Sequence, residues 1–343
     1  MAESFADDDD GGADVVFRRA VIPPELAGKR LDQAAAALIP EFSRSRLKAW
    51  IDAGCITLAG EPAEAKRKVR AGDELVLAAE LEAAVPVRPE PIPLTVVYED
   101  PALLVVDKPA GLIVHPGAGN PSGTLQNALL HLDPALAALP RAGLVHRLDK
   151  DTSGLLLVAR TLEAQAALAA RLERREIRRT YVAVCQGVLT GGGVVDAPIG
   201  RHPRDRLKQA VTGRGRAART HYRVLERFRA HTSIEVELET GRTHQIRVHM
   251  AHLRAPLVGD PLYGGRPRFP PQPTEGLRAL LETFGRQALH AARLALRHPG
   301  TGEPLSFESA LPADMEALLA ALRADAAAAA GRGRERDAYG ASR

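Results

Sequence analysis

The chain has 343 residues, of which 45% are hydrophobic and 26% are charged, enough for about two domains with cores of their own. This composition excludes a disulfide-stapled miniprotein, a fibrous repeat and a wholly disordered chain, and no apolar stretch approaches the ~20 residues of a membrane-spanning helix. The acidic start and the two well separated cysteines, Cys55 and Cys185, predict a cytoplasmic protein that does not associate with membranes.

The net charge of +4 is small, but the charges are distributed unevenly along the chain. Residues 1–14 hold six acidic and no basic side chains, whereas residues 171–229 hold 15 Lys and Arg against 5 Asp and Glu. A local excess of positive charge attracts polyanions and releases their counterions on contact. Residues 171–229 therefore indicate either a nucleic-acid partner or arginines on an ordinary solvated surface.

Composition divides the chain into five parts. Residues 1–16, which are acidic, and 326–343 are predicted to be disordered tails, because neither has a periodic apolar face. Four prolines fall within 82–93, which favours an extended linker. This linker separates a small unit, 17–81, from a large unit, 94–325.

In the small unit, the spacing of apolar residues predicts two short helices followed by a pair of strands. The first helix covers 31–39, and the second begins after a capping Ser43 and ends before Gly54. The apolar period then changes to that of strands, which are expected at 56–58 and 74–77.

The second helix carries three basic residues, Arg44, Arg46 and Lys48. Because Arg44 and Lys48 are four residues apart, they share one face of the helix. This face is a candidate site for phosphate groups.

Four short motifs follow one another in the small unit: K-R-L-D-Q (29–33), S-R-S-R-L-K-A-W-I-D-A-G (43–54), I-T-L (56–58) and G-D-E-L (72–75). Together they resemble the S4 RNA-binding module. The resemblance implies a small α/β domain that binds structured RNA through a basic helical face. A small helical domain with ordinary solvated charges is the alternative.

The large unit is predicted to be α+β, with a mainly antiparallel sheet. Strands are expected at 94–98, 103–107, 112–115, 155–158, 181–184 and 234–238, and helices at 124–130 and 161–176. The strands at 181–184 and 234–238 alternate apolar and polar residues, which is typical of a sheet with one solvated face.

Asp149 is a candidate catalytic carboxylate in the segment V-H-R-L-D-K-D-T-S-G (145–154). Loops held between rigid elements often carry catalytic groups. Arg147 and Lys150 would keep a partly buried Asp149 ionised, so that it could act as a nucleophile or a base. A turn aspartate that accepts hydrogen bonds from backbone N–H groups is the alternative.

A second polar cluster, G-R-T-H-Q-I-R-V-H-M-A-H (241–252), follows a predicted strand. Thr243 is expected to cap a helix, which places Arg247 one turn in, where it could hold a carboxylate bidentately. The three histidines of this segment do not share one helix face and no metalloprotease glutamate accompanies them, so no metal is expected.

Three segments in this order, H-R-L-D-K-D-T-S-G (146–154), R-R-T-Y-V-A-V-C-Q-G (178–187) and 241–252 followed by P-L-V-G-D-P-L-Y-G (256–264), resemble the motifs of RluA-type pseudouridine synthases. The resemblance covers about residues 17–325. Agreement with the D type of this family comes from H-P-G-A-G-N-P-S-G-T-L-Q-N-A-L-L-H (115–131), P-I-G-R-H-P (198–203) and Q-A-L-H-A (287–291).

The resemblance assigns roles to four residues. Asp149 is the essential aspartate, Tyr181 packs on the target base, and Arg247 pairs with Asp149. Arg147 fills the stack that the target uridine leaves when it is flipped out, which offsets part of the unstacking cost. The alternatives are a sheet residue for Tyr181 and a phosphate contact for Arg147.

The implied reaction isomerises uridine to pseudouridine without a cofactor. The N-glycosidic bond breaks, the uracil rotates, and it rejoins the ribose through C5; Asp149 either attacks C1′ or acts as a base that produces a glycal. The D type implies a monomer that acts on large-subunit ribosomal RNA, at the helix 69 stem-loop, or on a pre-50S particle. The alternatives are a non-catalytic S4-type RNA-binding protein and a glycosidic-bond hydrolase that uses Asp149 and Asp151.

Overall fold

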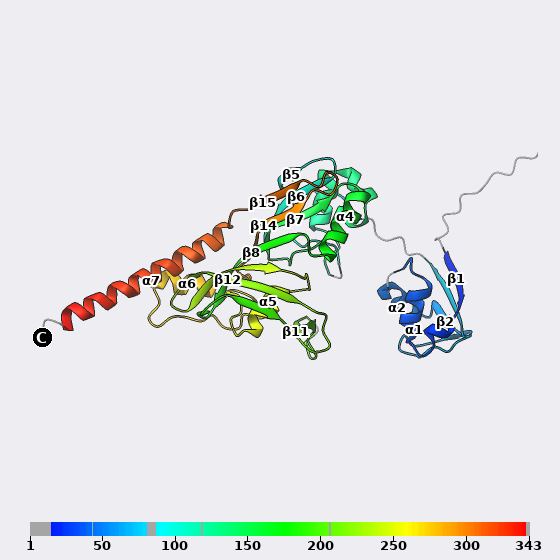
Figure 1. Ribbon diagram of the computed structural model, residues 1–343. Coiled ribbons are helices and arrows are strands. Elements are labelled where there is room, and N and C mark those ends of the chain that lie inside the picture. Colours follow the sequence, from blue (N-terminus) through cyan, green and yellow to red (C-terminus); the bar gives the residue numbers. More distant parts are fainter. Residues whose placement is uncertain (1–14, 43, 81–86, 118, 206, 341–343) are drawn as a thin grey trace, which may run out of the picture. The chain divides into compact units, whose positions relative to one another are not determined.

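The computed structural model describes residues 15–42, 44–80, 87–117, 119–205 and 207–340, which fall into two compact units (Figure 1). Unit 1 is Met1–Pro86 and unit 2 is Val87–Arg343. Each unit has a hydrophobic core of its own. The boundary falls within the stretch predicted as a linker.

The second half of that predicted linker is attached to unit 2. Residues 87–93 form no helix or strand, but the backbone N–H of Glu90 donates to the carbonyl of Asn127 at 3.0 Å. The carboxylate of Glu90 accepts from the N–H of Gly123 at 3.1 Å. Residues 81–86 lie outside the described part of the chain.

Unit 1 consists of two helices and a small sheet. Its elements are β1 (Val15–Val21), η1 (Pro24–Leu26), α1 (Leu31–Leu38), α2 (Arg44–Asp52), β2 (Ile56–Leu58), β3 (Glu61–Pro62) and β4 (Glu74–Glu80). The sheet order is β1-β4-β2-β3, and every pairing is antiparallel. Two helices on a small sheet agree with the expected S4-like unit, although the proposed cap Ser43 lies outside the described residues.

Strand β1 was not predicted, and it corrects the boundary of the acidic tail. It begins at Val15, inside the segment 1–16 that was predicted to be disordered. The strand is ordered because it pairs along its length with β4 and buries Val16 in the core of unit 1.

Unit 2 is built on one large sheet. Its elements are β5 (Thr95–Glu99), β6 (Leu103–Lys108), α3 (Leu125–Leu132), η2 (Pro134–Ala138), η3 (Pro140–Gly143), β7 (Ser153–Ala159), α4 (Leu162–Glu173), β8 (Arg178–Gln186), β9 (Gly193–Asp196), β10 (Ile199–Arg201), β11 (Gln209–Val211), β12 (Arg219–Arg227), β13 (His231–Leu238), α5 (Gln245–His252), α6 (Glu275–Thr283), β14 (Leu289–Arg297), β15 (Pro304–Glu308) and α7 (Ala313–Gly340). Within the described residues the sheet has nine strands in the order β5-β6-β7-β14-β8-β13-β12-β9, with β15 on β14.

The sheet confirms the α+β class. Its pairings are antiparallel except for the parallel contact between β7 and β14. Strand β8 lies in the middle and is buried on both faces, which corrects the expectation of a solvated face at 181–184. Helices and loops cover both faces there, so the apparent alternation in the sequence does not reflect exposure.

Residues 112–115 were predicted to be a strand and are not. Gly111 has a φ of 88°, which redirects the chain after β6. Leu112 and Val114 are buried in the core, and Ile113 forms one isolated bridge with Thr124. The apolar residues of this stretch therefore fill the core from a loop.

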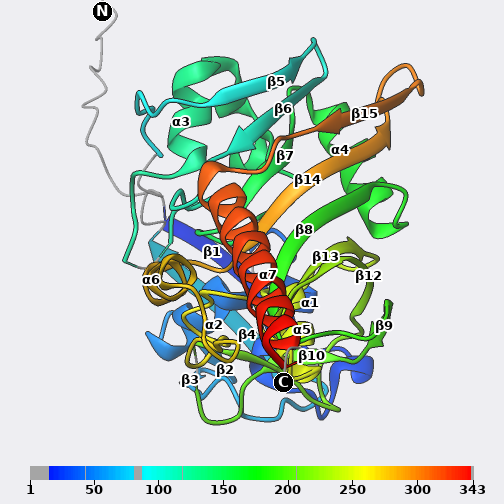
Figure 2. The same ribbon diagram turned by 90° about the vertical axis from the view of Figure 1, so that its left-hand side faces the viewer.

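The C-terminal tail was predicted to be disordered from residue 326, and this is wrong for residues 326–340. Helix α7 continues through them because five consecutive alanines, 326–330, favour a helix without needing an apolar stripe. The first half of α7 packs with α6 against β8 (Figure 2). No helix in the described part of the chain is long and apolar enough to cross a membrane.

Candidate active site

A pocket of about 490 Å³ in unit 2 brings together four residues that the sequence singled out. Arg147, Asp149, Tyr181 and Arg247 all line it. They come from the loop before β7, from strand β8 and from helix α5. Residues far apart in the sequence therefore form one site.

Asp149 is bound by an arginine. Its Oδ2 atom accepts a hydrogen bond from Nη1 of Arg247 at 3.1 Å, and 17% of its side chain is exposed to the pocket. No described backbone N–H donates to this carboxylate, which argues against a simple turn aspartate. Arg247 pairs with Asp149, as the resemblance implies, and neither Arg147 nor Lys150 forms an ion pair with it among the described residues. Asp151 is not among the described residues that line the pocket.

Arg247 is itself fixed by a second carboxylate, Asp260. The two side chains form a bidentate ion pair, with Nε 2.7 Å from Oδ2 and Nη2 2.9 Å from Oδ1. Burial alone would lower the pKa of Arg247, but the hydrogen bonds and charge of Asp260, together with Asp149, raise it. Arg247 is therefore a permanent cation with one nitrogen directed at Asp149.

Helix α5, which carries Arg247, begins differently from the prediction. Its N-cap is His244, in the left-handed conformation with a φ of 57°, so Thr243 does not cap the helix. The side chain of Gln245 holds the turn instead: its Oε1 accepts from the hydroxyl of Thr240 at 2.7 Å and from the N–H of Arg242 at 3.0 Å.

A buried lysine donates hydrogen bonds to the backbone of the loop that carries Asp149. Lys108 is 0% exposed, and its ammonium donates to the carbonyls of Pro109, Leu112 and Lys150 at 2.8 to 2.9 Å. Burial lowers the pKa of Lys108 to about 8. These bonds fix the backbone at the residue after Asp149.

His244 lies next to Asp149 on the other side of the carboxylate from Arg247's bonded oxygen. Its Nε2 atom is 4.0 Å from Oδ1 of Asp149, and its Nδ1 atom is 2.9 Å from the hydroxyl of Tyr263. That hydroxyl accepts from the backbone N–H of Gln209 at 2.8 Å. Burial lowers the pKa of His244, so the ring is neutral at pH 7. The described residues contain no group of side chains arranged to hold a metal ion.

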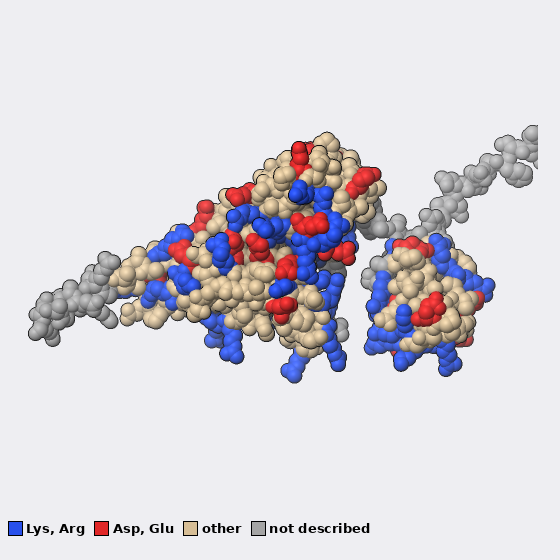
Figure 3. Space-filling view, viewed as in Figure 1, with Lys and Arg blue, Asp and Glu red and all other residues tan. Residues whose placement is uncertain are grey.

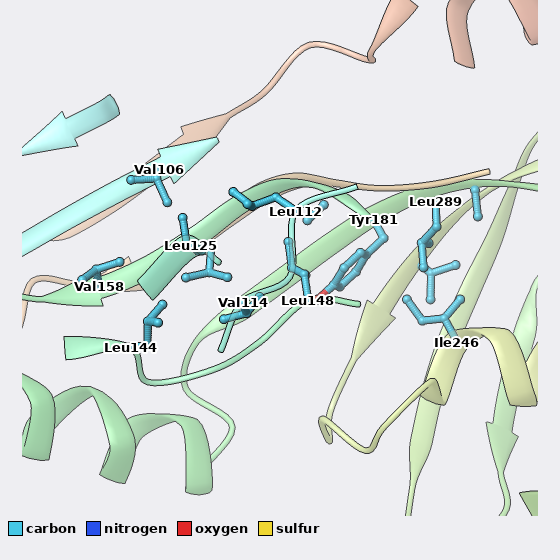
Figure 4. Packing of buried hydrophobic residues seen from close by; sticks show 14 of the residues in the cluster. Val106, Leu112, Val114, Leu125, Leu144, Leu148, Val158, Tyr181, Ile246 and Leu289 are labelled. Carbon is cyan, nitrogen blue, oxygen red and sulfur yellow. The ribbon is translucent and has the colours of Figure 1, made fainter. Parts of the chain in front are cut away.

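Tyr181 lies where the buried core of unit 2 meets the pocket. It is 5% exposed, and its ring lies between Leu148 and Ile246 (Figure 4). Its hydroxyl forms no hydrogen bond with the described residues, and burial raises its pKa. The ring is thus a rigid apolar surface whose phenol stays protonated.

Arg147 differs from Arg247 in its exposure and in its bonding. Its side chain is exposed, and it has no hydrogen bond or ion pair with the rest of the described chain. It lines the pocket two residues before Asp149. It can therefore change its position without breaking a hydrogen bond or an ion pair within the described chain.

The three basic residues predicted on the small unit do not belong to this pocket. They lie on unit 1, where Lys and Arg line much of the edge of the visible face (Figure 3). Arg44 donates to Asp32 at 2.7 Å, and Lys48 pairs with Asp52. The guanidinium of Arg46 lies 4.9 Å from the ring centroid of Trp50.

Comparisons with known proteins decide the family. The chain is 57% identical over 317 residues to ribosomal large subunit pseudouridine synthase D of Xanthomonas campestris pv. campestris, covering 92% of this chain and 96% of that protein. Identity to the protein of the same name from Pseudomonas aeruginosa is 55% over 313 residues, covering 91% and 98%. The chain belongs to the RNA pseudouridine synthase family.

Two further comparisons agree with membership of this family. Residues 102–252 match the family described as RNA pseudouridylate synthase. The solved structure of human RNA pseudouridylate synthase domain containing 4 has a TM-score of 0.52 and 28% identity, covering 67% of this chain and 93% of that one. The matched range contains Asp149, Tyr181 and Arg247.

The sequence did not point to Asp260 or to His244 as parts of the site. Asp260 was quoted within the motif 256–264 but received no role, although an aspartate followed by Pro-Leu-Tyr is typical of a turn that fixes its carboxylate. Its Oδ1 does accept from the N–H groups of Leu262 and Tyr263. His244 was considered only as a metal ligand.

Proposed function

We propose that this chain isomerises specific uridines of large-subunit ribosomal RNA to pseudouridine. The observation that carries the proposal is the pairing of Asp149 with Arg247 in a pocket that Tyr181 also lines. The names of the relatives, which are large-subunit pseudouridine synthases, support the substrate class.

Each pocket residue has one task in this proposal. The ring of Tyr181 packs on the flipped uracil. Arg147, which has no hydrogen bond or ion pair to lose within the described chain, enters the stack that the uracil leaves. Arg247 holds the carboxylate of Asp149 in position. These roles need no cofactor.

The chemistry balances within the substrate. The bond between C1′ and N1 breaks while Asp149 either bonds to C1′ or removes a ribose proton to give a glycal. After the uracil rotates, C5 bonds to C1′ as the bond between Asp149 and C1′ breaks or, in the glycal route, as Asp149 returns the proton to the ribose. The C5 proton then leaves, and N1 gains a proton. Burial raises the pKa of Tyr181, so its phenol accepts the C5 proton only if it passes its own proton on. A water near Asp149 is the other acceptor.

The proposal extends to the position of the modified uridines within the ribosomal RNA. We place the modified uridines in the helix 69 stem-loop, presented by free RNA or by a pre-50S particle, and we expect a cytoplasmic monomer. Unit 1, with the basic face of α2, would add phosphate contacts to those of unit 2. The relatives' substrate, large-subunit ribosomal RNA, supports this placement.

Tritium release tests the reaction. With RNA that carries tritium at C5 of uridine, an isomerase releases tritium to water without freeing uracil. A hydrolase frees uracil, and a binding protein does neither. Tritium release with no free uracil is the expected result, and either other result would contradict the proposal.

Mapping of pseudouridines tests the substrate. Ribosomal RNA from cells that lack this protein should have unmodified uridines in helix 69, and restoring the protein should restore the modification. Modification of helix 69 that persists without the protein would overturn the placement while leaving the reaction standing.

A further inference from the structure

One wall of the pocket carries a guanidinium without a counter-charge. Arg179 lies on β8 two residues before Tyr181, so both side chains are on the same face of the strand. Both line the pocket. Arg179 is only 9% exposed, and it has no hydrogen bond or ion pair with any residue that the structure describes.

The carboxylates of the pocket do not neutralise Arg179. Those that line it are Asp149, Glu173 and Glu239. Asp149 is bound by Arg247, and Glu239 accepts from Arg175 at 2.6 Å. Glu173 is exposed and forms no ion pair with Arg179 within the described chain. No carboxylate that lines the pocket therefore pairs with the positive charge of Arg179.

His146, which lies close to Arg179, adds a second donor without an acceptor. The backbone N–H of Leu157 donates to Nε2 of His146 at 3.0 Å, so that nitrogen is unprotonated. Burial, and then the charge of Arg179, lowers the pKa of His146 to about 3. The neutral ring therefore carries its proton on Nδ1, which is buried and has no partner. This part of the wall offers donors alone.

Further arginines make the surroundings of the pocket positive. Arg175, Arg216 and Arg242 also line it. Burial lowers the pKa of Arg242, and the charges of Arg216 and Arg175 lower it further, which shows that these cations repel one another. A buried cation among other cations destabilises the free protein unless an anion joins it.

We propose that Arg179 binds a backbone phosphate next to the uridine whose base packs on Tyr181. The proposal rests on the proposed function and assigns a phosphate site within that pocket. A planar guanidinium suits a phosphate because two of its N–H groups can donate in parallel. Phosphate is also the anion that an RNA substrate carries at every nucleotide.

The backbone around Arg179 leaves room for this contact. Gly241 lies against the guanidinium, and a Cβ atom at that position would be 3.1 Å from Nη1 of Arg179. The absence of a side chain there lets the guanidinium keep its place between β8 and the turn before α5. Arg179 would thus fix the backbone of the flipped nucleotide, while Arg147 fills the stack.

Arg179→Met tests the assignment, with Arg323→Met as the matched control. Arg323 is an exposed arginine on α7 that pairs with Glu226 and does not line the pocket. Because Arg179 has no partner in the free protein, we expect Arg179→Met to leave Tm unchanged or higher while KM for the RNA rises about tenfold. The control should change neither quantity.

Neutral phosphates in the RNA give the sharper readout. A methylphosphonate at one of the two phosphates that flank the target uridine should raise KM about tenfold for the wild type and add nothing for Arg179→Met. An equal effect on both proteins would overturn the proposal. So would a loss of Tm in Arg179→Met, because it would show that the arginine is structural.

Inorganic phosphate tests the site without turnover. It should raise the Tm of the wild type more than that of Arg179→Met, and an equal rise would overturn the phosphate site. A wild-type protein that is inactive on RNA, yet is stabilised by phosphate through Arg179, would count against the proposed function and not against this site.

Discussion

Arg247 and Asp260 form a buried bidentate ion pair in which the carboxylate is 0% exposed. The pair uses Nε and Nη2 of the arginine and leaves Nη1 for Asp149, 3.1 Å away. Asp260 is fixed in turn by the backbone N–H groups of Leu262 and Tyr263. The position of Asp149 thus depends on a turn more than a hundred residues further along the chain.

Asp260→Asn should therefore lower both stability and activity. An amide offers one oxygen instead of two and turns an NH₂ group toward the guanidinium. This removes the bidentate one of the two carboxylates that pair with the buried Arg247. Breaking a buried pair of this kind costs about 3–5 kcal/mol of the free energy of unfolding. Denaturant unfolding measures the loss, and tritium release measures the activity that remains.

The control for Asp260→Asn is Glu226→Gln. Glu226 pairs with Arg323 on the surface, and both side chains are exposed. This substitution should change the free energy of unfolding by less than about 1 kcal/mol and leave activity intact. If Asp260→Asn behaves like this control, the buried pair does not position Asp149.

Arg147→Ala and Arg247→Ala should fail at different steps. The exposed Arg147 has no bond to lose in the free protein, so its loss should slow base flipping; an RNA whose target uridine is already unpaired should recover part of the rate. Arg247→Ala removes the partner of Asp149, and its defect should persist on the unpaired RNA. Single-turnover rates on paired and unpaired substrates measure the difference. Recovery for Arg247→Ala alone would mean that the two roles are reversed.

Removal of residues 1–80 should weaken RNA binding without unfolding unit 2. The cut leaves the bonds of Glu90 to unit 2 in place, and unit 2 has its own core. Loss of the basic face around Arg44 and Lys48 should reduce the slope of log K against log salt, because fewer counterions are released. Binding titrations at several salt concentrations measure this slope. A slope equal to that of the full chain would refute a role for unit 1 in phosphate binding.

Site residues that lie in contiguous sequence motifs could be predicted from the sequence. Site residues whose role depends on a partner distant in the sequence could not. Asp149 and Arg247 each lie in a compact polar segment, which made them candidates, and the resemblance of those segments to family motifs supplied their roles and their pairing. The second partner of Arg247 could not be predicted, since Asp260 differs from other turn aspartates only through the buried arginine beside it. In the sequence Arg179 is one of many arginines. Only the structure shows that its side chain is buried without a partner among the described residues.

For the fold too, elements with a local sequence pattern could be predicted, and elements that depend on tertiary pairing or packing could not. Periodicity predicted helices such as α1 and α4 because each packs one apolar face. It missed β1, whose run of Val-Val-Phe-Arg-Arg-Ala-Val becomes a strand by pairing with β4. It also missed the second half of α7, where the propensity of alanine continues a helix that packing began.

Stability should fall in acid partly because of His231. Burial lowers its pKa to about 4, and neither ring nitrogen has a partner within the described chain. The unfolded chain takes up this proton near the ordinary pKa of ~6.5 and the folded chain does not. The stabilising contribution is therefore complete above about pH 6.5 and is lost as the pH falls toward 4, by up to ~1.4 kcal/mol per unit.

His231→Phe should flatten that pH dependence, because the residue that takes up the proton on unfolding is gone. Free energies of unfolding measured at several values between pH 4.5 and 6.5 give the slope. His131→Phe, at an exposed histidine of α3, is the control and should leave the slope unchanged. A slope that stays the same in His231→Phe would show that His231 is protonated in the folded protein.

The central claim is that the carboxylate of Asp149 performs the chemistry in this pocket. Tritium release by Asp149→Asn on RNA labelled at C5 of uridine tests it most directly, since the amide has nearly the same shape but cannot act as nucleophile or base. We expect no release above background, with RNA affinity within a few-fold of the wild type. Sustained turnover by the folded Asp149→Asn protein would contradict the claim.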